Sequence, residues 1–417
     1  MHANIGELPR ANGPGRIPFI HLLRAIAPLF VIVAHLGGWW LGVAEQRSTA
    51  HDLWFNLIVK PLHLHQDGGH LGVVLFFLIS GFIISHVATR ETRLEFIVKR
   101  VFRIVPTLWI GVALLAASAW IATRCGLPNY GNYATRPVDY LLNMFLLDQP
   151  ILYRTSGLSV TWSLFVEVIF YGLVAGMITQ LRTSPVRSTV ILSAVSFALM
   201  LPHTISSFAA YMMYFTEYLP FLVIGRCFYL EYSKQISADQ MWSIVAVNFF
   251  LFCLLYSSHH DYLFKPSGSE PFVTYVGGVL IFYVVMKANI LTILRPVAFL
   301  ADISYALYIV HVPVGMLALT AMQHLPIPFS IRFAIATGAS VLVATVIFAK
   351  IERPMQRWCR SMLDRRSGVG CSHLGVLIRS ADNDVLAIAA EIPTVISGDI
   401  RRVTVCPKPR RAAWAAS

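Results

Sequence analysis

The stretch IPFIHLLRAIAPLFVIVAHLGGWW, residues 17–40, decides the fold class. It is long enough to cross the hydrocarbon core of a bilayer, which takes about 20 apolar residues in a helix. The whole chain shares this character, because 56% of its 417 residues are hydrophobic, 13% are charged and its mean hydropathy is +0.64. Soluble domains carry about 25% charged residues. The composition excludes an ordinary cytosolic enzyme and a disordered chain, and it predicts a polytopic membrane protein.

Ten apolar stretches, bounded by charged residues, proline or glycine, predict an all-α bundle of about ten transmembrane helices. They cover residues 17–43, 70–88, 99–122, 160–179, 189–201, 208–230, 241–257, 272–287, 298–321 and 329–350. The fifth and the eighth are short. Residues 140–147 are apolar enough for a half-buried interfacial helix.

The basic residues predict the orientation of the bundle. Lys and Arg number 33 against 21 Asp and Glu, a net charge of +12, and cytoplasmic loops hold most such residues in membrane proteins. With the N-terminus inside, the inner segments hold thirteen Lys and Arg and the outer loops six. We therefore expect a multi-pass protein of the bacterial inner (plasma) membrane, with both termini cytoplasmic and no nucleic-acid partner.

The chain divides into three predicted regions. These are a polar cytoplasmic leader (1–16), a transmembrane domain (17–358) and a basic tail of unknown structure (359–417). The leader does not have the pattern of a cleaved signal peptide. From Arg353 onward the chain supplies half of the net charge, and basic residues beside a membrane face pair with anionic lipid head groups.

The six cysteines carry no predicted site. They are Cys125, Cys227, Cys253, Cys359, Cys371 and Cys406. They lie far apart without a CxxC pair, so the sequence predicts neither a zinc site nor a disulfide framework. We expect no metal ion.

Two polar residues stand inside the first predicted span. Arg24 and His35 are eleven residues apart, which is about three helical turns and places them on one face about 16 Å apart. Ionisable side chains inside a span are costly and by default mark function. The alternative is structural: Arg24 extends toward the head groups and His35 bonds a neighbouring helix carbonyl.

The fourth span carries an acid in SVTWSLFVEVIFYG, residues 159–172. Glu167 lies about ten residues from the outer end, with Ser163 one turn earlier on the same face. Since Glu167 and His35 are at similar depths, the sequence predicts a His–Glu pair in which the carboxylate orients the imidazole as a general base. The alternative is that these polar residues only hold neighbouring helices together and take no part in a reaction.

The ninth span has a polar stripe in ADISYALYIVHVPVG, residues 301–315. Ser304, Tyr308 and His311 follow one another at spacings of four and three, which places them on one side of a helix. Pro313 interrupts the helix and often frees backbone groups at a site. His311 alone would more often be a buried structural histidine.

The third span starts with a basic group in FIVKRVFRIVP, residues 96–106. Arg100 and Arg103 stand at i and i+3, and a guanidinium pair binds phosphate bidentately. The sequence therefore predicts a phosphate clamp for a donor such as acyl-CoA, presented from the cytoplasm. A simple positive-inside anchor is equally compatible with these residues.

Six blocks stand in order over residues 17–358. They are IHLLRAIAPLFVIVAH (20–35), GHLGVVLFFLISGFIIS (69–85), KRVFRIVP (99–106), TWSLFVEVIFY (161–171), ISYALYIVHVPV (303–314) and IERPMQRW (351–358). Together they resemble the blocks of the integral membrane acyltransferase-3 family, which includes O-antigen and exopolysaccharide O-acetyltransferases. The resemblance implies a ten-span fold that transfers an acyl group from cytoplasmic acyl-CoA to a hydroxyl, often on a sugar.

Matching the blocks residue by residue assigns expected roles. The expected catalytic residues are His35, Glu167 and Arg24. The expected substrate-binding residues are Arg100, Arg103, Trp162, Ser163, Tyr308 and His311. Two departures stand out, because His70-Leu71 replaces the common Gly-Gly or Gly-Phe, and Val168 replaces a common second acid whose role is therefore in doubt. Many members carry an additional C-terminal SGNH domain, and we expect none here.

The sequence thus predicts a membrane O-acyltransferase with acyl-CoA as co-substrate and no cofactor. The acyl group is expected to be acetyl, and the acceptor a saccharide, glycolipid or exopolysaccharide. In the hypothesised mechanism Arg100 and Arg103 hold the CoA phosphates. His35, oriented by Glu167, removes the hydroxyl proton, and Arg24 or another donor stabilises the oxyanion.

Three alternatives stay open at this point. Transfer can be direct or pass through a covalent acyl-histidine. The polar residues can instead form the proton relay of a transporter or flippase of a lipid-linked saccharide. The chain can also be a non-catalytic assembly partner. Acceptor, acyl chain and oligomeric state are not predicted.

Overall fold

The computed structural model describes residues 17–132, 134, 136–199, 201, 206–259, 270–288, 290 and 292–366. Within this part the regular elements are helices, apart from one isolated bridge between Asn132 and Leu158. The predicted all-α fold class is confirmed. The predicted leader and nearly all of the predicted tail lie outside the described residues.

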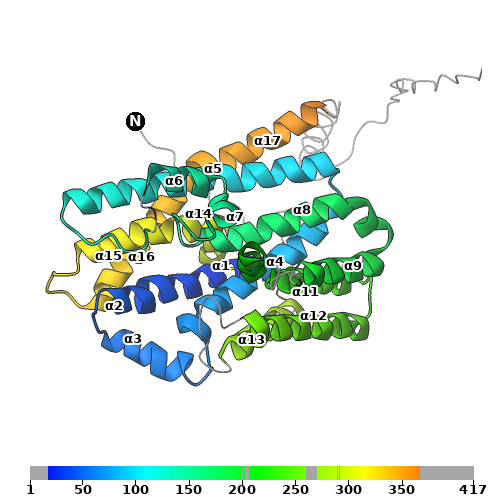
Figure 1. Ribbon diagram of the computed structural model, residues 1–417, viewed down its shortest axis with the longest axis horizontal. Coiled ribbons are helices and arrows are strands. Elements are labelled where there is room, and N and C mark those ends of the chain that lie inside the picture. The colour runs from blue at the N-terminus through cyan, green and yellow to red at the C-terminus, as the bar shows by residue number, and fades with distance from the viewer. Residues whose placement is uncertain are drawn as a thin grey trace, which may run out of the picture. The chain divides into compact units, whose positions relative to one another are not determined.

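The helices follow one another along the chain as Figure 1 shows. The first half contains α1 (Pro18–Ile32), η1 (Val33–Trp39), α2 (Trp40–Val43), α3 (Thr49–Trp54), η2 (Phe55–Val59), η3 (His65–Gly68), α4 (Gly69–Ala88), α5 (Arg93–Arg124), α6 (Pro137–Met144), α7 (Asp148–Leu152), α8 (Thr161–Thr183) and α9 (Pro185–Ala198). The second half contains α10 (Ser207–Thr216), α11 (Leu219–Tyr232), α12 (Ala238–His259), α13 (Glu270–Lys287), α14 (Arg295–Val310), η5 (His311–Met316), α15 (Leu317–Ala321), α16 (Phe329–Ile347), η6 (Phe348–Glu352) and α17 (Arg353–Arg366).

The apolar helices of the described part match the ten predicted spans one for one. Eight are long enough to cross a membrane: Pro18–Val43, His65–Ala88, Arg93–Arg124, Thr161–Thr183, Ser207–Tyr232, Ala238–Ser257, Arg295–Ala321 and Phe329–Arg365. Two shorter ones, Pro185–Ala198 and Pro271–Lys287, are the fifth and eighth stretches that the sequence predicts to be short. The chain is a multi-pass membrane protein.

Two further predictions concern segments outside these spans. Helix α6 lies where a short helix was expected around residues 140–147. Helix α17 continues across the predicted domain boundary at residue 358 and ends at Arg366.

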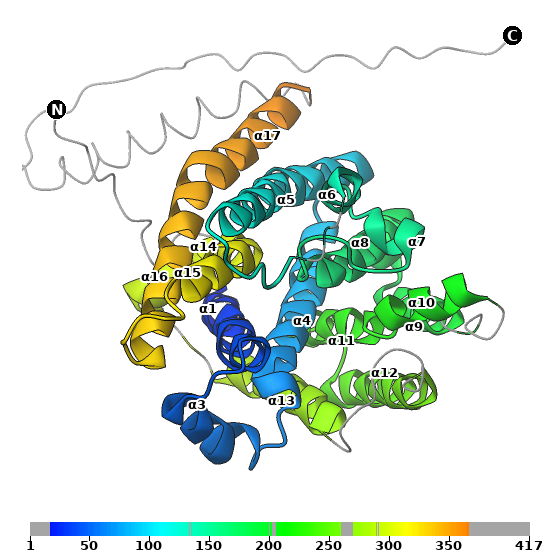
Figure 2. The same cartoon turned by 60° about the vertical axis from the view of Figure 1, so that its left-hand side comes forward.

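Helices α1 and α4 lie side by side inside the bundle, with α14 next to α1 and α11 next to α4 (Figure 2). Glycines allow the closest approach. A Cβ at Gly81 of α4 would lie 2.0 Å from the Leu222 carbonyl oxygen of α11, and one at Gly225 of α11 would lie 2.2 Å from the Leu78 carbonyl oxygen of α4. Small residues at such positions let transmembrane helices touch through their backbones.

Candidate active site

The two histidines of the first and ninth spans meet inside the bundle. His35 Nδ1 lies 2.9 Å from His311 Nε2, and the two rings stack with centroids 5.1 Å apart. His35 belongs to the π-helical turn η1, and His311 begins the π-helical turn η5. Pro313 lies inside η5 and has no N–H for an ordinary helical bond, which accounts for the widened turn there. Such π turns occur frequently at functional sites.

The hydrogen bonds of His311 decide which nitrogen of His35 is available for chemistry. His311 Nδ1 lies 2.9 Å from the Tyr308 carbonyl oxygen, which can only accept a hydrogen bond. With both rings neutral, His311 Nδ1 therefore carries a proton and Nε2 accepts one from His35 Nδ1. His35 Nε2 is then left with a lone pair. This is the arrangement that a general base requires.

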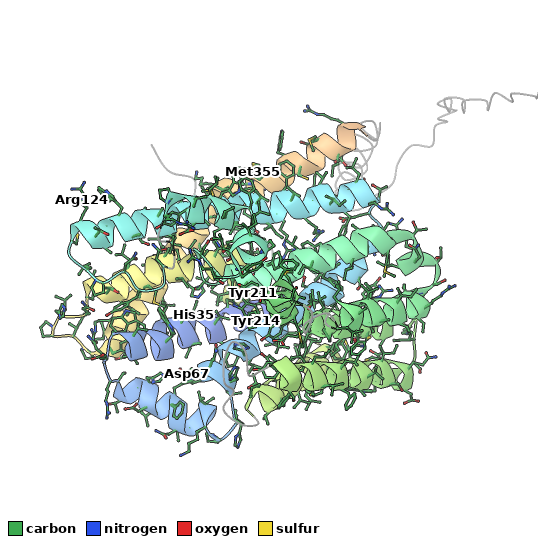
Figure 3. The ribbon with its side chains drawn as sticks, viewed as in Figure 1. His35, Asp67, Arg124, Tyr211, Tyr214 and Met355 are labelled. Atoms are coloured by element: carbon green, nitrogen blue, oxygen red, sulfur yellow. The ribbon has the colours of Figure 1, made fainter. Side chains whose placement is uncertain are left out.

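His35 lines a large cavity of about 790 Å³. We call it the His35 cavity. Its walls are rich in aromatic and polar side chains, including Trp39, His65, Asp67, His70, Tyr153, Arg154, Trp162, Tyr211, Tyr214, Glu217, Tyr218, Tyr256 and Tyr308. Figure 3 labels His35, Asp67, Tyr211 and Tyr214 among them. Aromatic faces combined with carboxylates and hydroxyls can hold a large polar ligand.

The predicted pair between His35 and Glu167 is wrong. Glu167 Oε1 accepts a hydrogen bond of 2.5 Å from Ser80 Oγ and another from the Tyr171 hydroxyl, whereas the partner of His35 is His311. Residue spacing gives a depth along each helix but not the direction in which each side chain points. In the structure, Glu167 lines a different cavity from the one that His35 lines.

That second cavity is small, about 80 Å³. We call it the Arg24 cavity. Its polar lining consists of Arg24, Ser80, Arg103, Ser163, Glu167, Tyr171, Ser304, Tyr305 and Tyr308. Arg24 Nη2 donates to Ser304 Oγ at 3.2 Å. A cavity of this size has room for several water molecules but not for a nucleotide.

Glu352 belongs to the same electrostatic cluster. It interacts with Arg24 and Arg103, is 4% exposed and has one carboxylate oxygen, Oε2, without a hydrogen bond. Buried charges need partners of opposite sign. The Glu-Arg-Pro block resembles the family, but sequence reasoning assigned Glu352 no role.

The two arginines of the predicted phosphate clamp have different partners. Arg100 is 8% exposed, lies 3.6 Å from Glu91 and covers the Phe96 ring at 5.4 Å. Arg103 lines the Arg24 cavity. Glu91 is shared between Arg100 and Lys99, whose Nζ lies 3.1 Å from the other carboxylate oxygen, and of the two clamp arginines only Arg103 lines the cavity.

The two cavities share a wall made of Val73 and Tyr308. The Tyr308 hydroxyl lies 2.7 Å from Ser163 Oγ and 3.3 Å from the Val160 carbonyl oxygen, to which it donates. The predicted substrate-binding residues Trp162, Ser163 and Tyr308 therefore gather around this wall. Trp162 lines the His35 cavity and Ser163 the Arg24 cavity.

The suggested role of Arg24 as oxyanion donor beside His35 is not compatible with this geometry. An oxyanion donor must lie about 3 Å from the oxygen. Arg24 lines the Arg24 cavity and not the His35 cavity, about three helical turns, or roughly 16 Å, from His35. Tyr308 is the donor group nearest to both cavities.

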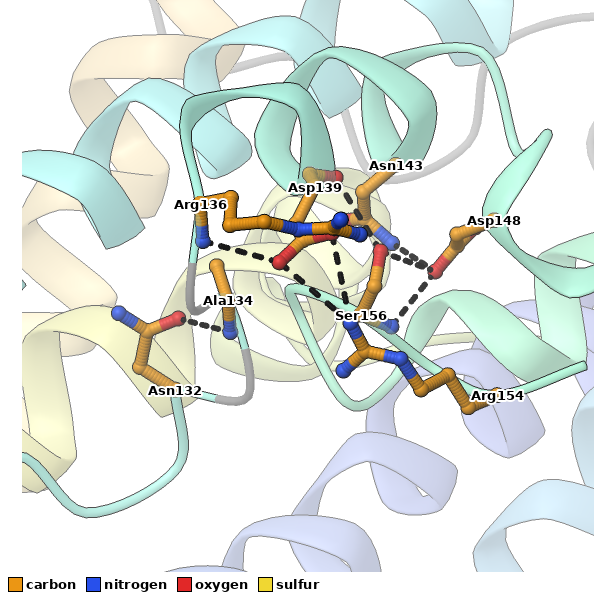
Figure 4. A network of polar contacts seen from close by, with 8 residues as sticks. All are labelled: Asn132, Ala134, Arg136, Asp139, Asn143, Asp148, Arg154 and Ser156. Atoms are coloured by element: carbon orange, nitrogen blue, oxygen red, sulfur yellow. Dashed lines mark hydrogen bonds and ion pairs between the residues drawn. The ribbon is translucent and has the colours of Figure 1, made fainter. Parts of the chain in front are cut away.

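Sequence reasoning missed the part of the site that comes from loops. The chain between α5 and α8 contributes Arg154 to the His35 cavity. Arg154 Nη2 lies 3.4 Å from Oδ1 of the fully buried Asp139, which also pairs with Arg136. Asp148 accepts hydrogen bonds of 2.9 Å from Asn143 Nδ2 and from the Ser156 amide (Figure 4). Such dispersed acids give no helical spacing by which a sequence could identify them.

The two departures from the family fall in different places. His70, where the family often has glycine, lines the His35 cavity, and its Nδ1 lies 2.5 Å from the Tyr275 hydroxyl. Val168, where a second acid is common, is 39% exposed and lines neither cavity. The first departure therefore changes the site, and the second does not.

A multi-pass helical bundle with a histidine pair and a buried Arg–Glu cluster inside its spans is an integral membrane protein with an intramembrane polar site. The acyltransferase-domain model of the acyltransferase-3 family matches residues 17–349. The chain belongs to this family, as the six blocks predict.

Curated relatives share this region at low identity. A putative peptidoglycan O-acetyltransferase, YrhL of Bacillus subtilis, is 25% identical over 375 residues, which are 82% of this chain and 55% of that protein. The O-acetyltransferase OatA of Staphylococcus aureus is 24% identical over 84% of this chain and 59% of its own length. The peptidoglycan O-acetyltransferase OatA of Listeria monocytogenes is 22% identical over 82% and 56%. The chain thus spans a little over half the length of these relatives. No solved structure gives a significant match.

Proposed function

We propose that the chain is a membrane O-acyltransferase that transfers an acetyl group from cytoplasmic acetyl-CoA to a hydroxyl of a saccharide or glycolipid. The observation that carries the proposal is the pair of unlike cavities that meet at Tyr308. The larger cavity contains His35, whose Nε2 can accept a proton, and has room for a sugar. The other is small and is lined by two partly buried arginines, Arg24 and Arg103.

The donor enters on the side of the Arg24 cavity. Arg103 lines this cavity and is only partly buried, so its guanidinium, a group that binds phosphate strongly, is proposed to hold a CoA phosphate at the mouth of the cavity. Because the cavity has a volume of only about 80 Å³, the nucleotide stays outside and the acyl end of the pantetheine arm enters. The excess of Lys and Arg on the segments at this end of the bundle supports its assignment to the cytoplasmic side.

The acceptor occupies the His35 cavity. Its hydroxyl gives a proton to His35 Nε2 while the oxygen forms a bond to the thioester carbonyl carbon. The Tyr308 hydroxyl turns away from the Val160 carbonyl oxygen, to which it donates in the structure, and donates to the oxyanion that develops. The C–S bond then breaks, and the CoA sulfur leaves with the proton from His35. The products are an ester and free CoA.

Two observations favour this function over the transporter alternative. The chain belongs to the acyltransferase-3 family, and relatives are named O-acetyltransferases of peptidoglycan or without a stated acceptor. A short acyl chain agrees with the size of the Arg24 cavity, and a saccharide acceptor agrees with the aromatic walls of the other cavity.

The proposal, like the variants below, is tested with the purified full chain in sealed lipid vesicles, with labelled acetyl-CoA on one side of the membrane and a panel of oligosaccharides on the other. We expect labelled ester that mild base removes. A chain that transfers no label to any saccharide, but moves a lipid-linked saccharide in response to a proton gradient, would contradict the proposal. Labelling in the absence of acceptor separates a covalent acyl-enzyme from direct transfer.

A further inference from the structure

A strained turn at the wall of the His35 cavity carries an acid that no sequence block predicts. Gln66 and Asp67 have φ of +48° and +54°, and Gly68 follows at +89°. Left-handed backbone is unusual for residues other than glycine. Such strain persists only where several surrounding contacts fix the backbone, and it is frequent at ligand-binding sites. Gln66 and Asp67 both line the cavity.

The surroundings contact Asp67 at two places, its carboxylate and its backbone carbonyl. His51 Nε2 of α3 lies 3.6 Å from Asp67 Oδ2. Trp54, on the same helix, donates its indole N–H to the Asp67 carbonyl oxygen at 3.3 Å. The segment between the first two spans therefore folds back to fix this one residue.

The carboxylate lies against Gly38 of η1. A Cβ added at Gly38 would come within 1.5 Å of Asp67 Oδ2, so only glycine leaves space for the acid there. Gly38 follows His35 by three residues in the π turn η1 and lines the same cavity. His35 and Asp67 are thereby neighbours on the wall of the same cavity, and Figure 3 labels both.

We propose that Asp67 is a binding residue for the acceptor, and that it accepts hydrogen bonds from hydroxyl groups next to the one that reacts at His35. This inference rests on the proposed function. A carboxylate has two oxygens and accepts from two hydroxyls at once, and the faces of Trp39 and Trp162 on the same cavity provide flat apolar surfaces for a sugar ring. The acceptor class is a polyhydroxylated saccharide that presents hydroxyls, and not a carboxylate, to Asp67, because two carboxylates side by side repel each other.

The geometry predicts a difference between two kinds of acceptor. A saccharide with neighbouring hydroxyls binds Asp67 as well as reacting at His35. A simple alcohol reacts at His35 without using Asp67. Removing the charge of Asp67 therefore affects the first kind of acceptor alone.

The test compares Asp67→Asn with the unchanged full chain in lipid vesicles, using acetyl-CoA as donor. The probes are chitotriose, maltotriose and 1-propanol. We expect Asp67→Asn to raise KM for the trisaccharide that serves as acceptor by about 10- to 100-fold, the range for a hydrogen bond to a charged group. The KM for acetyl-CoA and the rate with 1-propanol stay unchanged. Asparagine tolerates left-handed backbone as aspartate does, so this variant keeps the turn.

The matched control is Asp52→Asn. Asp52 lies next to His51 on α3, is exposed and does not line the cavity, so we expect wild-type kinetics. A second variant, His51→Gln, keeps the Asp67 carboxylate and removes its ionic partner, and we expect a smaller rise in the same KM.

The outcomes separate this inference from the function on which it rests. If the unchanged chain acetylates no probe, the proposed function and the inference are both overturned. If it acetylates a trisaccharide with the same KM in wild type and Asp67→Asn, the inference alone is overturned. An equal loss with trisaccharide and 1-propanol also overturns it, because Asp67 then acts on something other than the neighbouring hydroxyls.

Discussion

The His35 cavity and the Arg24 cavity differ in nearly every property that decides what a cavity can bind. The first is about 790 Å³ and aromatic, while the second is about 80 Å³ and holds two arginines beside an acid. They meet at Val73 and Tyr308. The difference supports the proposal that one intramembrane site serves two unlike substrates, each from its own cavity, with the reaction at the shared wall.

The largest expected effect is at His35, the base of the acceptor side. His35→Ala should lower the rate of acetyl transfer by about 10²- to 10⁴-fold, the usual contribution of general base catalysis. The rate is measured with labelled acetyl-CoA in vesicles. His324→Ala, which changes an exposed histidine, is the control. Full activity of His35→Ala would show that His35 is not the base that acts on the acceptor hydroxyl.

The second-largest effect is expected at Tyr308, in the wall that the two cavities share. Tyr308→Phe removes the hydroxyl that faces both cavities, and loss of one oxyanion donor costs about 10²- to 10³-fold in kcat. We expect kcat to fall while both KM values stay near those of wild type. Tyr283→Phe on α13, outside both cavities, should have no effect. A change confined to KM would make Tyr308 a binding residue and move the reaction elsewhere.

His311 acts through His35, so its effect should be smaller. His311→Leu removes the acceptor that fixes the tautomer of His35, and we expect kcat to fall about 10- to 100-fold, as for other orienting partners. His311→Gln offers an amide oxygen in its place and should recover part of the rate. If both variants lose the same activity, His311 has only a packing role.

Substituting each arginine of the predicted clamp tests how the donor is bound. Arg103→Ala should raise KM for acetyl-CoA about tenfold, because a charge-assisted bond to phosphate is lost. Arg100→Ala should change it about threefold or less, since Glu91 already pairs with Arg100. Titration of acetyl-CoA at saturating acceptor measures both. Equal effects would restore the predicted two-arginine clamp.

The smallest effect concerns the pH dependence of stability at the His51–Asp67 contact. The Asp67 carboxylate raises the pKa of His51 above its ordinary value of 6.5, against an opposing effect of burial. The contact therefore stabilises the fold fully below about pH 6.5, and this contribution is lost as the pH rises through the raised pKa. We expect Tm to fall more between pH 6 and pH 8 in the wild type than in His51→Gln. Parallel curves would exclude a charged His51.

The architecture could be predicted from sequence because it depends on local composition. Apolar length alone identified the spans, including the two short ones, since a bilayer requires a fixed length of apolar helix. The depth of His35, Glu167 and His311 followed from counting residues along each span. These quantities do not require knowledge of which helices are neighbours.

The partners within the site could not be predicted, because they depend on how helices turn toward one another. Equal depth suggested His35 with Glu167, but the π turns η1 and η5 bring His35 to His311 instead. Spacing of three suggested a clamp of Arg100 and Arg103, but Glu91, in the turn before α5, pairs with one of them. Asp67 and Arg154 come from loops, where no periodicity indicates direction.

Donor and acceptor are proposed to reach the shared wall from opposite sides of the membrane, because Arg24 and His35, which line the two cavities, lie about 16 Å apart along the first span. The most direct measurement uses sealed vesicles with the full chain, in which labelled acetyl-CoA and the acceptor trisaccharide are placed in opposite compartments or in the same one. The account predicts acetylated saccharide when the two substrates are separated by the membrane, and none when they share a compartment. Transfer only when both are in the same compartment would contradict it.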